Sequence, residues 1–499
     1  MVARGAGTVV WYVASAGAVP GRTTGLRPAR CTLNAPIPPA TTLTRALGPR
    51  EALSLVVGRI IGSGIFRTPG PIMALVLSPG PFFAVWLLAG AMTMLSALCY
   101  AELVAMLPKS GGPYAYLKEA YPPWWAFLRG WAMFFVSETA SIAAVALVFA
   151  QYSAVLWSAS GGSKWPRGLE TSLAVAGVWL FTWVNARGVQ AGGRVQNVLT
   201  VLKLGGLVAV AGAGLALARG AGLTDGGAAA AASTATAAAT APTMGLWATV
   251  LAVGAAMRYA FFAFSGWEGA TYVAEEVRDP EKNLPRSILW GIGVVLGIYL
   301  LVNLAYLKQL GPAGMAGSKQ VAADAMRAAL GSGGAVLIAL AVVLSTAGNI
   351  NAQVMVKART WHAMARDGLF PQRLGVVDGT RHTPIGALIG QALWATVLLV
   401  AAGLAGRAYE TVIDFFAFTS AIFNLSTFVA VWVLRRKLPQ LARPFRVPGW
   451  PVTLVVVLVI QVAFMIVTLV TAPLPSLLGI ALTASGLVWY RWGRGRPRN

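Results

Sequence analysis

The sequence predicts an all-helical integral membrane protein, because of its composition and its long apolar segments. Hydrophobic residues make up 57% of the 499 residues and charged residues only 11%, whereas soluble globular proteins carry roughly 25% charged residues. Apolar segments recur along the chain, each near the ~20 residues that a helix needs to cross the hydrocarbon core of a bilayer. Only helices and closed barrels satisfy their backbone groups in lipid, and these segments are too long and too continuously apolar for barrel strands.

About twelve transmembrane helices are predicted from these segments. The count becomes eleven when the last two segments form a re-entrant pair around Pro473 and Pro475. The predicted spans are 51–78, 81–107, 125–157, 170–187, 197–218, 247–275, 286–307, 334–363, 384–405, 409–434, 450–472 and 474–491.

The net charge of +23 is explained by membrane topology. Lys and Arg outside the predicted spans concentrate on the side of the N-terminus, which the positive-inside rule assigns to the cytoplasm. Both termini are therefore expected in the cytoplasm, and nucleic acid is not an expected partner. The plasma membrane is the expected location. An organelle membrane is the alternative, because an Arg-rich, acid-poor N-terminal tail is also typical of a transit peptide.

The chain divides into four parts on this interpretation. The first 50 residues contain six arginines, no acidic residue and proline clusters such as "PIPP", and are expected to be disordered. A low-complexity spacer at 226–243 joins the fifth and sixth spans. The four parts are a disordered basic cytoplasmic tail (1–50), a core of ten spans (51–437), two additional C-terminal helices (438–492) and a basic cytoplasmic tail (493–499).

Neither a metal site nor a cofactor is expected. The chain has two cysteines, Cys31 and Cys99, and two histidines, His362 and His382, which are too few and too scattered for a zinc site or a disulfide framework. No arrangement of residues typical of a catalytic site accompanies them, so the sequence gives no support to a membrane enzyme.

Two of the predicted helices carry residues that interrupt helical structure. The first contains "VGRIIGSGIFRTPG" (57–70) and the sixth contains "AMRYAFFAFSGWEGATYVAEE" (256–276), each with small residues near the middle of the membrane. Interrupted helices at corresponding positions, five spans apart, indicate an inverted-repeat transporter with its site at the midplane. The alternative is that the glycines only allow helices to pack closely, but two interruptions in register favour a site.

The chemistry of such interruptions fits an α-amino acid. Unwinding frees backbone groups that lipid cannot satisfy and a polar ligand can. The half-helix beginning near Gly64 directs its N-terminal amides at the site and attracts a carboxylate. Carbonyl groups near Phe262 and Ser265 would accept hydrogen bonds from an ammonium group.

Four motifs in order resemble one known family. They are "VGRIIGSGIF", "CYAELVAMLPKSGGPYAYLKEAY", "AFFAFSGWEGATYVAEEVRDPEKNLPRSI" and "STAGNINAQVMVKARTWHAMARDGLFP". Together they are similar to the L-type amino acid transporters, the light subunits of heteromeric transporters in the amino acid–polyamine–organocation superfamily. The resemblance implies a LeuT-like fold of five plus five inverted helices with helices 1 and 6 broken. It also implies alternating access by rocking of helix bundles and, usually, obligate exchange of amino acids.

The resemblance assigns roles to individual residues. Gly62, Ser63 and Gly64 resemble the carboxylate-binding backbone of the family, Phe262 its aromatic gate, and Ser265 the position whose carbonyl binds the ammonium group. Lys203 matches the lysine that takes the place of a sodium ion in sodium-coupled relatives, which implies transport without sodium. The full set of predicted substrate-binding residues is Ile61, Gly62, Ser63, Gly64, Phe262, Ser265, Gly266, Glu138 and Glu268, with Lys203 as the coupling residue.

The sequence departs from the family pattern at three places. The loop between spans 3 and 4, "SASGGSKWPRGLE" (158–170), has no cysteine, which excludes a disulfide-linked heavy chain through this loop and leaves a noncovalent partner open. Glu138 and Glu268 are acids within predicted spans, and intramembrane acids either contact substrate or form internal ion pairs. Available partners include Arg59, Lys203 and Lys357. In the first case, the acids would favour cationic substrates.

The function predicted from the residues and the resemblance is sodium-independent transport of amino acids, with cationic or broad neutral selectivity. Two alternatives stay open at this point. One is a polyamine transporter or a proton-coupled amino acid symporter, and the other is a transporter-like receptor that senses amino acids.

Overall fold

The computed structural model describes residues 43, 45–159, 168–217, 246–318, 320–405, 408–471 and 473–494. The spacer at 226–243, Cys31, most of the loop between spans 3 and 4 and nearly all of the N-terminal tail lie outside these residues. The described residues are helical apart from loops and turns, and their one isolated β-bridge joins Leu47 to Val277. The prediction of an all-helical protein is confirmed.

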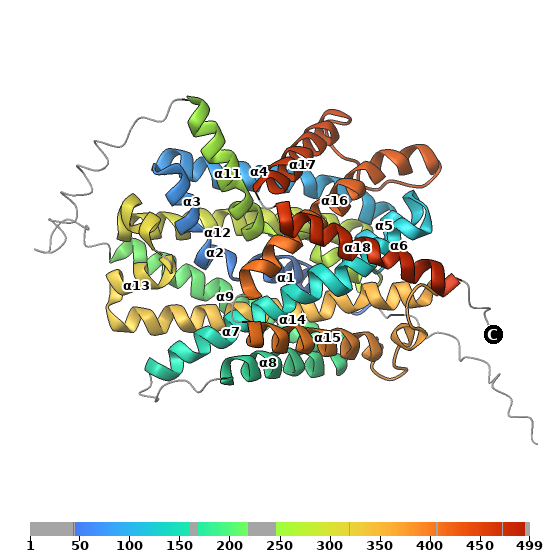
Figure 1. Cartoon of the computed structure of the whole chain (residues 1–499), viewed down its shortest axis with the longest axis horizontal. Helices are drawn as coiled ribbons and strands as arrows, with labels where there is room; N and C mark the ends of the chain where they lie inside the picture. The colour runs from blue at the N-terminus through green and yellow to red at the C-terminus, as the bar shows by residue number, and fades with distance from the viewer. Residues whose placement is uncertain are drawn as a thin grey trace, which may run out of the picture. The chain divides into compact units, whose positions relative to one another are not determined.

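The first half of the chain contains nine α-helices and one π-helix in its described residues (Figure 1). Several begin with proline at the first helical position, where the ring's fixed φ suits the helix and its missing N–H is no loss. The elements are α1 (Pro49–Ile60), α2 (Gly64–Arg67), α3 (Pro69–Val76), α4 (Pro79–Met106), α5 (Pro113–Ala120), α6 (Pro123–Ala132), η1 (Met133–Ser137), α7 (Glu138–Ala159), α8 (Leu169–Ala186) and α9 (Val189–Ala216).

The second half repeats the pattern of long apolar helices joined by short segments. Two short 3₁₀ helices lie among them. The elements are α11 (Leu246–Phe264), η2 (Trp267–Glu276), α12 (Pro280–Gly317), α13 (Val321–Leu330), α14 (Ser332–Arg366), η3 (Gln372–Gly375), α15 (Ile385–Ala405), α16 (Ala408–Lys437), α17 (Val452–Thr471) and α18 (Pro473–Arg494).

Seven helices in the described part of the chain are long and apolar enough to cross a membrane. All twelve predicted segments contain helix. The fifth begins earlier than predicted, because α9 starts at Val189, directly after Gly188, whose φ of +127° ends the preceding turn. The seven helices are Pro79–Met106, Pro123–Ser158, Val189–Ala216, Pro280–Gly317, Val336–Arg366, Phe418–Lys437 and Val452–Val470.

Both predicted helix interruptions are present. α1 ends at Ile60 and α2 begins at Gly64, after which the chain continues through Thr68, in helical conformation, into α3. α11 ends at Phe264, and Gly266 takes a φ of +97° before η2 begins. A side chain rarely adopts this left-handed conformation, so glycine is the residue suited to the second interruption.

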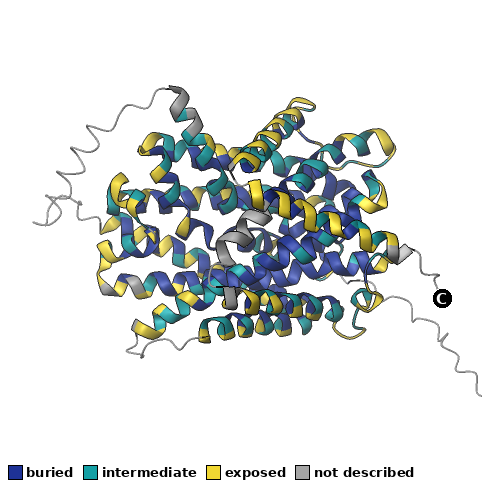
Figure 2. Cartoon of the chain, viewed as in Figure 1, coloured by how far each residue is buried: buried dark blue, intermediate teal, exposed yellow. Residues whose placement is uncertain are grey.

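The interrupted helices lie at the centre of the packing. α1 packs on α9, α12, α14 and η2, while α14 also packs along α7, which runs beside it in Figure 1. Figure 2 shows buried residues concentrated in these central helices and exposed residues on outer helices such as α8, α15, α17 and α18. Exposed apolar residues on the outer helices, such as Leu393 and Val459, suit contact with lipid tails.

Described residues before position 50 contact the rest of the chain. The backbone N–H of Leu47 donates to the carbonyl of Glu276 at 2.8 Å, and the N–H of Arg278 donates to the carbonyl of Leu47 at 2.9 Å. Leu47 is also fully buried. This short strand-like contact joins the segment before α1 to the segment before α12, and composition alone did not reveal it because the partner lies more than 200 residues away in the sequence.

Candidate functional site

The broken end of α1 is held by side chains from three other helices. Helix ends leave carbonyl groups without intrahelical partners, and here the carbonyls of residues 58–62 all accept hydrogen bonds. Their donors are Lys203 Nζ to Gly58 (2.9 Å) and Ile61 (2.6 Å), Asn349 Nδ2 to Arg59 (2.7 Å), Tyr299 Oη to Ile60 (3.2 Å), and Ser345 Oγ to Ile61 (3.2 Å) and Gly62 (3.4 Å). The interruption is therefore a built structural feature.

Lys203 is the one cation among these donors. Its ammonium group is fully buried and bridges two carbonyls of α1 from its position on α9. Gly348 on α14 leaves room for it, since a Cβ at this glycine would lie 3.4 Å from Nζ. Among the residues that the structure describes, the hydrogen-bond acceptors of this ammonium group are two backbone carbonyls.

The two interruptions contact each other. A Cβ at Gly64 would lie 2.7 Å from Cα of Ala263, and a Cβ at Gly266 would lie 3.2 Å from the carbonyl oxygen of Arg59. The hydroxyl of Tyr299 lies 3.2 Å from the carbonyl of Ile60 and 3.0 Å from that of Ala263, so it can donate to either broken helix. Only small residues permit this approach of two backbones.

A cavity of about 720 Å³ lies at the junction of the interruptions. Its size is typical of a site for a small molecule. The predicted residues that line it are Gly62, Ser63, Gly64, Glu138, Phe262, Ser265, Gly266 and Glu268. Two predicted residues, Ile61 and Lys203, are not part of the lining: both are buried, and the carbonyl of Ile61 is already bonded to Lys203 and Ser345.

Glu138 forms an internal ion pair and also lines the cavity. Its Oε2 lies 2.5 Å from Nζ of Lys357 and 3.6 Å from Nη2 of Arg59, and all three side chains are almost completely buried. Lys357 also donates to the backbone carbonyl of Glu138 at 2.8 Å. The ion pair and the cavity contact, which the sequence left as alternatives for Glu138, therefore occur together.

Three polar residues of α14 form a hydrogen-bonded chain beside this pair. Asn349, Gln353 and Lys357 are linked in sequence by hydrogen bonds of 2.5 Å, and Ser345, one turn earlier on the same face, donates to the carbonyl of Gly62 at 3.4 Å. The predicted site did not include Ser345, Asn349 and Gln353. Their spacing of four residues places them on one face of a helix, which is a signal that could have found them.

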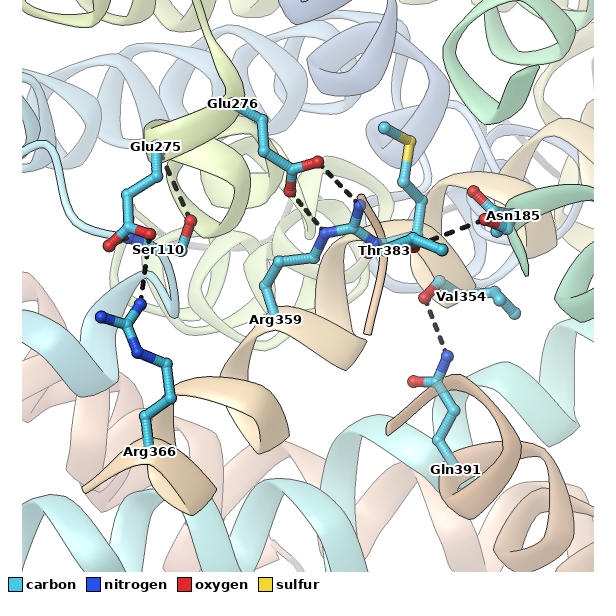
Figure 3. Close-up of polar contacts among 10 residues, drawn as sticks. Ser110, Asn185, Glu275, Glu276, Val354, Arg359, Arg366, Thr383 and Gln391 are labelled. Atoms are coloured by element: carbon cyan, nitrogen blue, oxygen red, sulfur yellow. Dashed lines mark hydrogen bonds and ion pairs between the residues drawn. The ribbon is translucent and has the colours of Figure 1, made fainter. Parts of the chain in front are cut away.

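The cytoplasmic ends predicted for the sixth and eighth spans are tied together by charged residues (Figure 3). Glu276 accepts two hydrogen bonds from Arg359, from Nε at 2.6 Å and Nη2 at 2.9 Å, and both side chains are fully buried. Beside this pair, Glu275 lies 3.6 Å from Arg366 and accepts a hydrogen bond from the backbone N–H of Ser110 at 3.2 Å. These contacts join the end of η2 to α14 and to the segment before α5.

A second pair of contacts joins α5 to the end of α14. Asp367, directly after α14, accepts a hydrogen bond from the hydroxyl of Tyr114 at 2.6 Å and pairs with Lys118 at 2.5 Å. Both partners belong to α5, and burial raises the pKa of the Tyr114 hydroxyl well above its usual range. Tyr114 therefore stays protonated and acts as a donor at physiological pH.

Comparison with known proteins identifies the family. The family model described as amino acid permease matches residues 47–490. The mouse large neutral amino acids transporter small subunit 2 is 32% identical over 452 residues, covering 90% of this chain and 81% of the relative. The human b(0,+)-type amino acid transporter 1 is 30% identical over 459 residues (91% and 88%), and the mouse Asc-type amino acid transporter 1 is 31% identical over 459 residues (91% and 83%).

These relatives are transporters and not enzymes, and they match almost the whole described chain, including both interrupted helices. The resemblance carried by the four motifs is confirmed. The chain belongs to the amino acid permease family and is a multi-pass membrane transporter.

Proposed function

We propose that the protein is a sodium-independent amino acid transporter that works by exchange. The observation that carries this proposal is the cavity between the two interruptions, whose lining contains Ser63 and Gly64 at the start of α2 as well as Ser265, directly after the end of α11. Amides at the start of a helical segment attract a carboxylate, and free carbonyls accept from an ammonium group. The names of the relatives, all amino acid transporters, support the same substrate class.

Sodium independence rests on Lys203. Its ammonium group supplies the positive charge between α9 and the broken end of α1, with contacts of 2.9 and 2.6 Å to two carbonyls. A sodium ion would be bound by such carbonyls, and the fixed lysine leaves no room for one beside them. We propose that Lys203 couples the broken first helix to the eighth span, represented by α14.

The proposed fold has twelve spans, with helices 1 to 5 and 6 to 10 forming an inverted repeat. The contact between the interruptions in spans 1 and 6 supports the repeat. With cytoplasmic termini, the ion pairs at the ends of η2 and α14 close the cytoplasmic side, while the cavity lining continues along α2, α11 and α17. This combination supports a conformation that is closed toward the cytoplasm, one of the two required for alternating access.

We propose that the protein lies in the plasma membrane. We also propose that any partner protein binds it noncovalently. The mouse relative is named a small subunit, which supports assembly with a second protein. The loop between spans 3 and 4 contains no cysteine in its sequence, so we propose that this loop makes no disulfide to a heavy chain.

Counterflow into proteoliposomes tests the proposal. We expect uptake of labelled leucine in sodium-free buffer, strongly stimulated by unlabelled leucine inside the vesicles and unchanged by added sodium. Uptake that ignores internal substrate but follows an imposed pH gradient would replace exchange by proton symport. Saturable binding without uptake would favour the sensor, and uptake of spermidine without leucine would favour a polyamine transporter.

Selectivity for cationic side chains is not favoured by the geometry around Glu138. The carboxylate is already shared by Lys357 and Arg59, so we propose broad selectivity. We expect Glu138→Gln to lower uptake of leucine and arginine alike by about tenfold or more, because Lys357 loses its buried counter-charge. The ratio of arginine to leucine uptake should stay constant. A selective loss of arginine uptake would instead make Glu138 a recognition residue for cationic substrates.

A further inference from the structure

A second cavity, of about 280 Å³, lies where α8 ends and α9 begins. The described residues that line it are Trp183, Ala186 and Arg187 from the end of α8, and Arg381 from the segment between η3 and α15. None of them lines the cavity between the interruptions. The proposed transport function uses none of these residues, so this cavity needs an explanation of its own.

The two arginines of this cavity come from segments that the fold holds together. Gly188 has a φ of +127°, and a Cβ at this position would lie 3.3 Å from the carbonyl oxygen of Arg381. The hydroxyl of Thr383 donates to the carbonyl of Asn185 at 3.5 Å, a contact drawn in Figure 3. Membrane topology explains basic residues on this side of the protein. It does not explain why Arg187 and Arg381, nearly 200 residues apart in the sequence, meet at one cavity.

Neither guanidinium group of the cavity is neutralised by a bonded partner. The side chains of Arg187 and Arg381 form no hydrogen bond or ion pair with another residue in the described part of the chain. Asp378 lies in the same turn as Arg381 and interacts with it electrostatically. The Oδ1 atom of Asp378, however, already accepts hydrogen bonds from the backbone N–H groups of Thr380 and Arg381 at 3.0 and 2.7 Å. The cavity therefore offers guanidinium donors to a ligand and carries more positive than negative charge.

The position of the cavity along α8 corresponds to the headgroup level of a bilayer. Leu180, Trp183 and Arg187 are exposed, and their spacing of three and four residues places them on one face of the helix. Along this face an apolar residue is followed by a tryptophan and then an arginine, which is the order expected from the acyl chains through the interface to the headgroups. On α15, which packs on α8, Ile389 and Leu393 are exposed apolar residues as well.

We infer that this cavity binds the phosphate group of an anionic membrane lipid, in the leaflet that we propose to be cytoplasmic. Guanidinium groups bind phosphate oxygens through paired N–H donors, and basic pockets between transmembrane helices on the cytoplasmic side bind lipid headgroups. The guanidinium carbon of Arg187 lies 3.9 Å from the ring centre of Trp183, and this stacking holds the arginine at the cavity.

The source of the phosphate follows from the surfaces beside the cavity. A soluble phosphate ion offers the same oxygens to the two arginines. Only a lipid also has acyl chains, which can cover the exposed apolar faces of α8 and α15. The inference goes beyond the proposed function and does not depend on which substrate is transported.

Native mass spectrometry and thermal unfolding of the full-length protein in detergent test the site. The ligands are phosphatidylglycerol, which is anionic, phosphatidylcholine, whose choline group balances its phosphate, and inorganic phosphate. The variants are Arg187→Gln, Arg381→Gln and the double variant. Arg194→Gln is the matched control, because Arg194 is an exposed arginine near the start of α9 that is not among the lining residues.

We expect phosphatidylglycerol to bind the wild type and Arg194→Gln about tenfold or more tightly than phosphatidylcholine, and to raise their midpoint temperatures of unfolding. Loss of a hydrogen bond to a charged group corresponds to a factor of about ten or more in affinity. Each single variant should therefore lose about this factor for phosphatidylglycerol. The double variant should bind the two lipids about equally.

Three results would overturn the inference. Equal binding of the two lipids by the wild type would exclude a site for anionic lipid, even when the double variant does not fold. A preference for phosphatidylglycerol that both single variants retain in full would place the lipid elsewhere on the protein. Inorganic phosphate that displaces phosphatidylglycerol and stabilises the wild type equally would make the cavity a site for a soluble anion.

Discussion

Replacing Lys203 with methionine is expected to reduce amino acid uptake by roughly a hundredfold. Methionine is similar to lysine in length and is tolerated in a buried site, but it donates no hydrogen bond. The carbonyls of Gly58 and Ile61 then lose donors at 2.9 and 2.6 Å. Hydrogen bonds to charged groups contribute about 1.5–3 kcal/mol each. Losing two of them destabilises the observed conformation of the broken helix by about 3 kcal/mol or more, which lowers its population by a factor of about a hundred.

A matched control separates this effect from the loss of a lysine as such. Lys308 also donates to a helix-end carbonyl, that of Leu215 at 3.1 Å, but this hydrogen bond lies at the exposed surface of the protein. We expect Lys308→Met to keep uptake within about twofold of the wild type, because solvent replaces the lost donor. Both variants are measured in counterflow at equal amounts of folded protein. Wild-type uptake by Lys203→Met would contradict a coupling role for Lys203.

A shorter side chain at position 203 tests sodium independence directly. Lys203→Ala removes the ammonium group and leaves the carbonyl oxygens of Gly58 and Ile61 pointing at an empty position, and oxygen ligands are what sodium prefers. Partial recovery of Lys203→Ala uptake by sodium, with no sodium effect on the wild type, would mean that the lysine substitutes for an ion. An absence of recovery would restrict Lys203 to holding α1 in place.

The interruptions could be predicted from the sequence because they are local. Glycine weakens a helix in any context, and the interruptions contain Gly62, Gly64 and Gly266. An unwound segment in the membrane is unfavourable in free energy unless its backbone N–H and C=O groups find hydrogen-bond partners. Lys203 could be found for a similar reason, since a lysine within an apolar span needs a partner. The identity of that partner depends on how α9 and α14 pack around α1, and no local pattern carries this information.

The pairing of charges could not be predicted for the same physical reason. Glu138 had several cations available in the sequence, and the choice of Lys357 and Arg59 follows from the packing of α7 on α14. Arg129 was not among the predicted site residues, because an arginine near the predicted start of a span is ordinarily a cytoplasmic topology signal. It is buried beside Phe423 of α16, and this packing cannot be inferred from the local sequence.

Replacing Glu276 with glutamine is expected to open the side of the protein that we propose to be cytoplasmic. The carboxylate accepts two hydrogen bonds from Arg359 at 2.6 and 2.9 Å, and neither side chain is exposed. Removing one partner of a buried pair leaves an uncompensated charge, at a cost of about 3–5 kcal/mol. The closed conformation contains the pair, so its population relative to open conformations should fall by about a hundredfold or more.

Cysteine labelling measures this shift. Thr360 is fully buried beside the closed end, and its hydroxyl donates to the carbonyl of Gly111 at 3.4 Å. In a protein lacking Cys31 and Cys99, a Thr360→Cys variant should react slowly with a membrane-permeant thiol reagent. Adding Glu276→Gln should accelerate the reaction by about the same factor as the shift in population.

The neighbouring pair is the matched control for this prediction. Glu275 and Arg366 lie 3.6 Å apart with side-chain exposures of 31% and 51%, and exposed ion pairs contribute about 0–1 kcal/mol. Glu275→Gln should therefore change the labelling rate by no more than a few-fold. Combining Glu276→Met with Arg359→Met removes both buried charges and should slow labelling again, because apolar replacements of a buried pair are often neutral. Equal labelling in Glu276→Gln and Glu275→Gln would show that burial of the Glu276–Arg359 pair does not hold the cytoplasmic side closed.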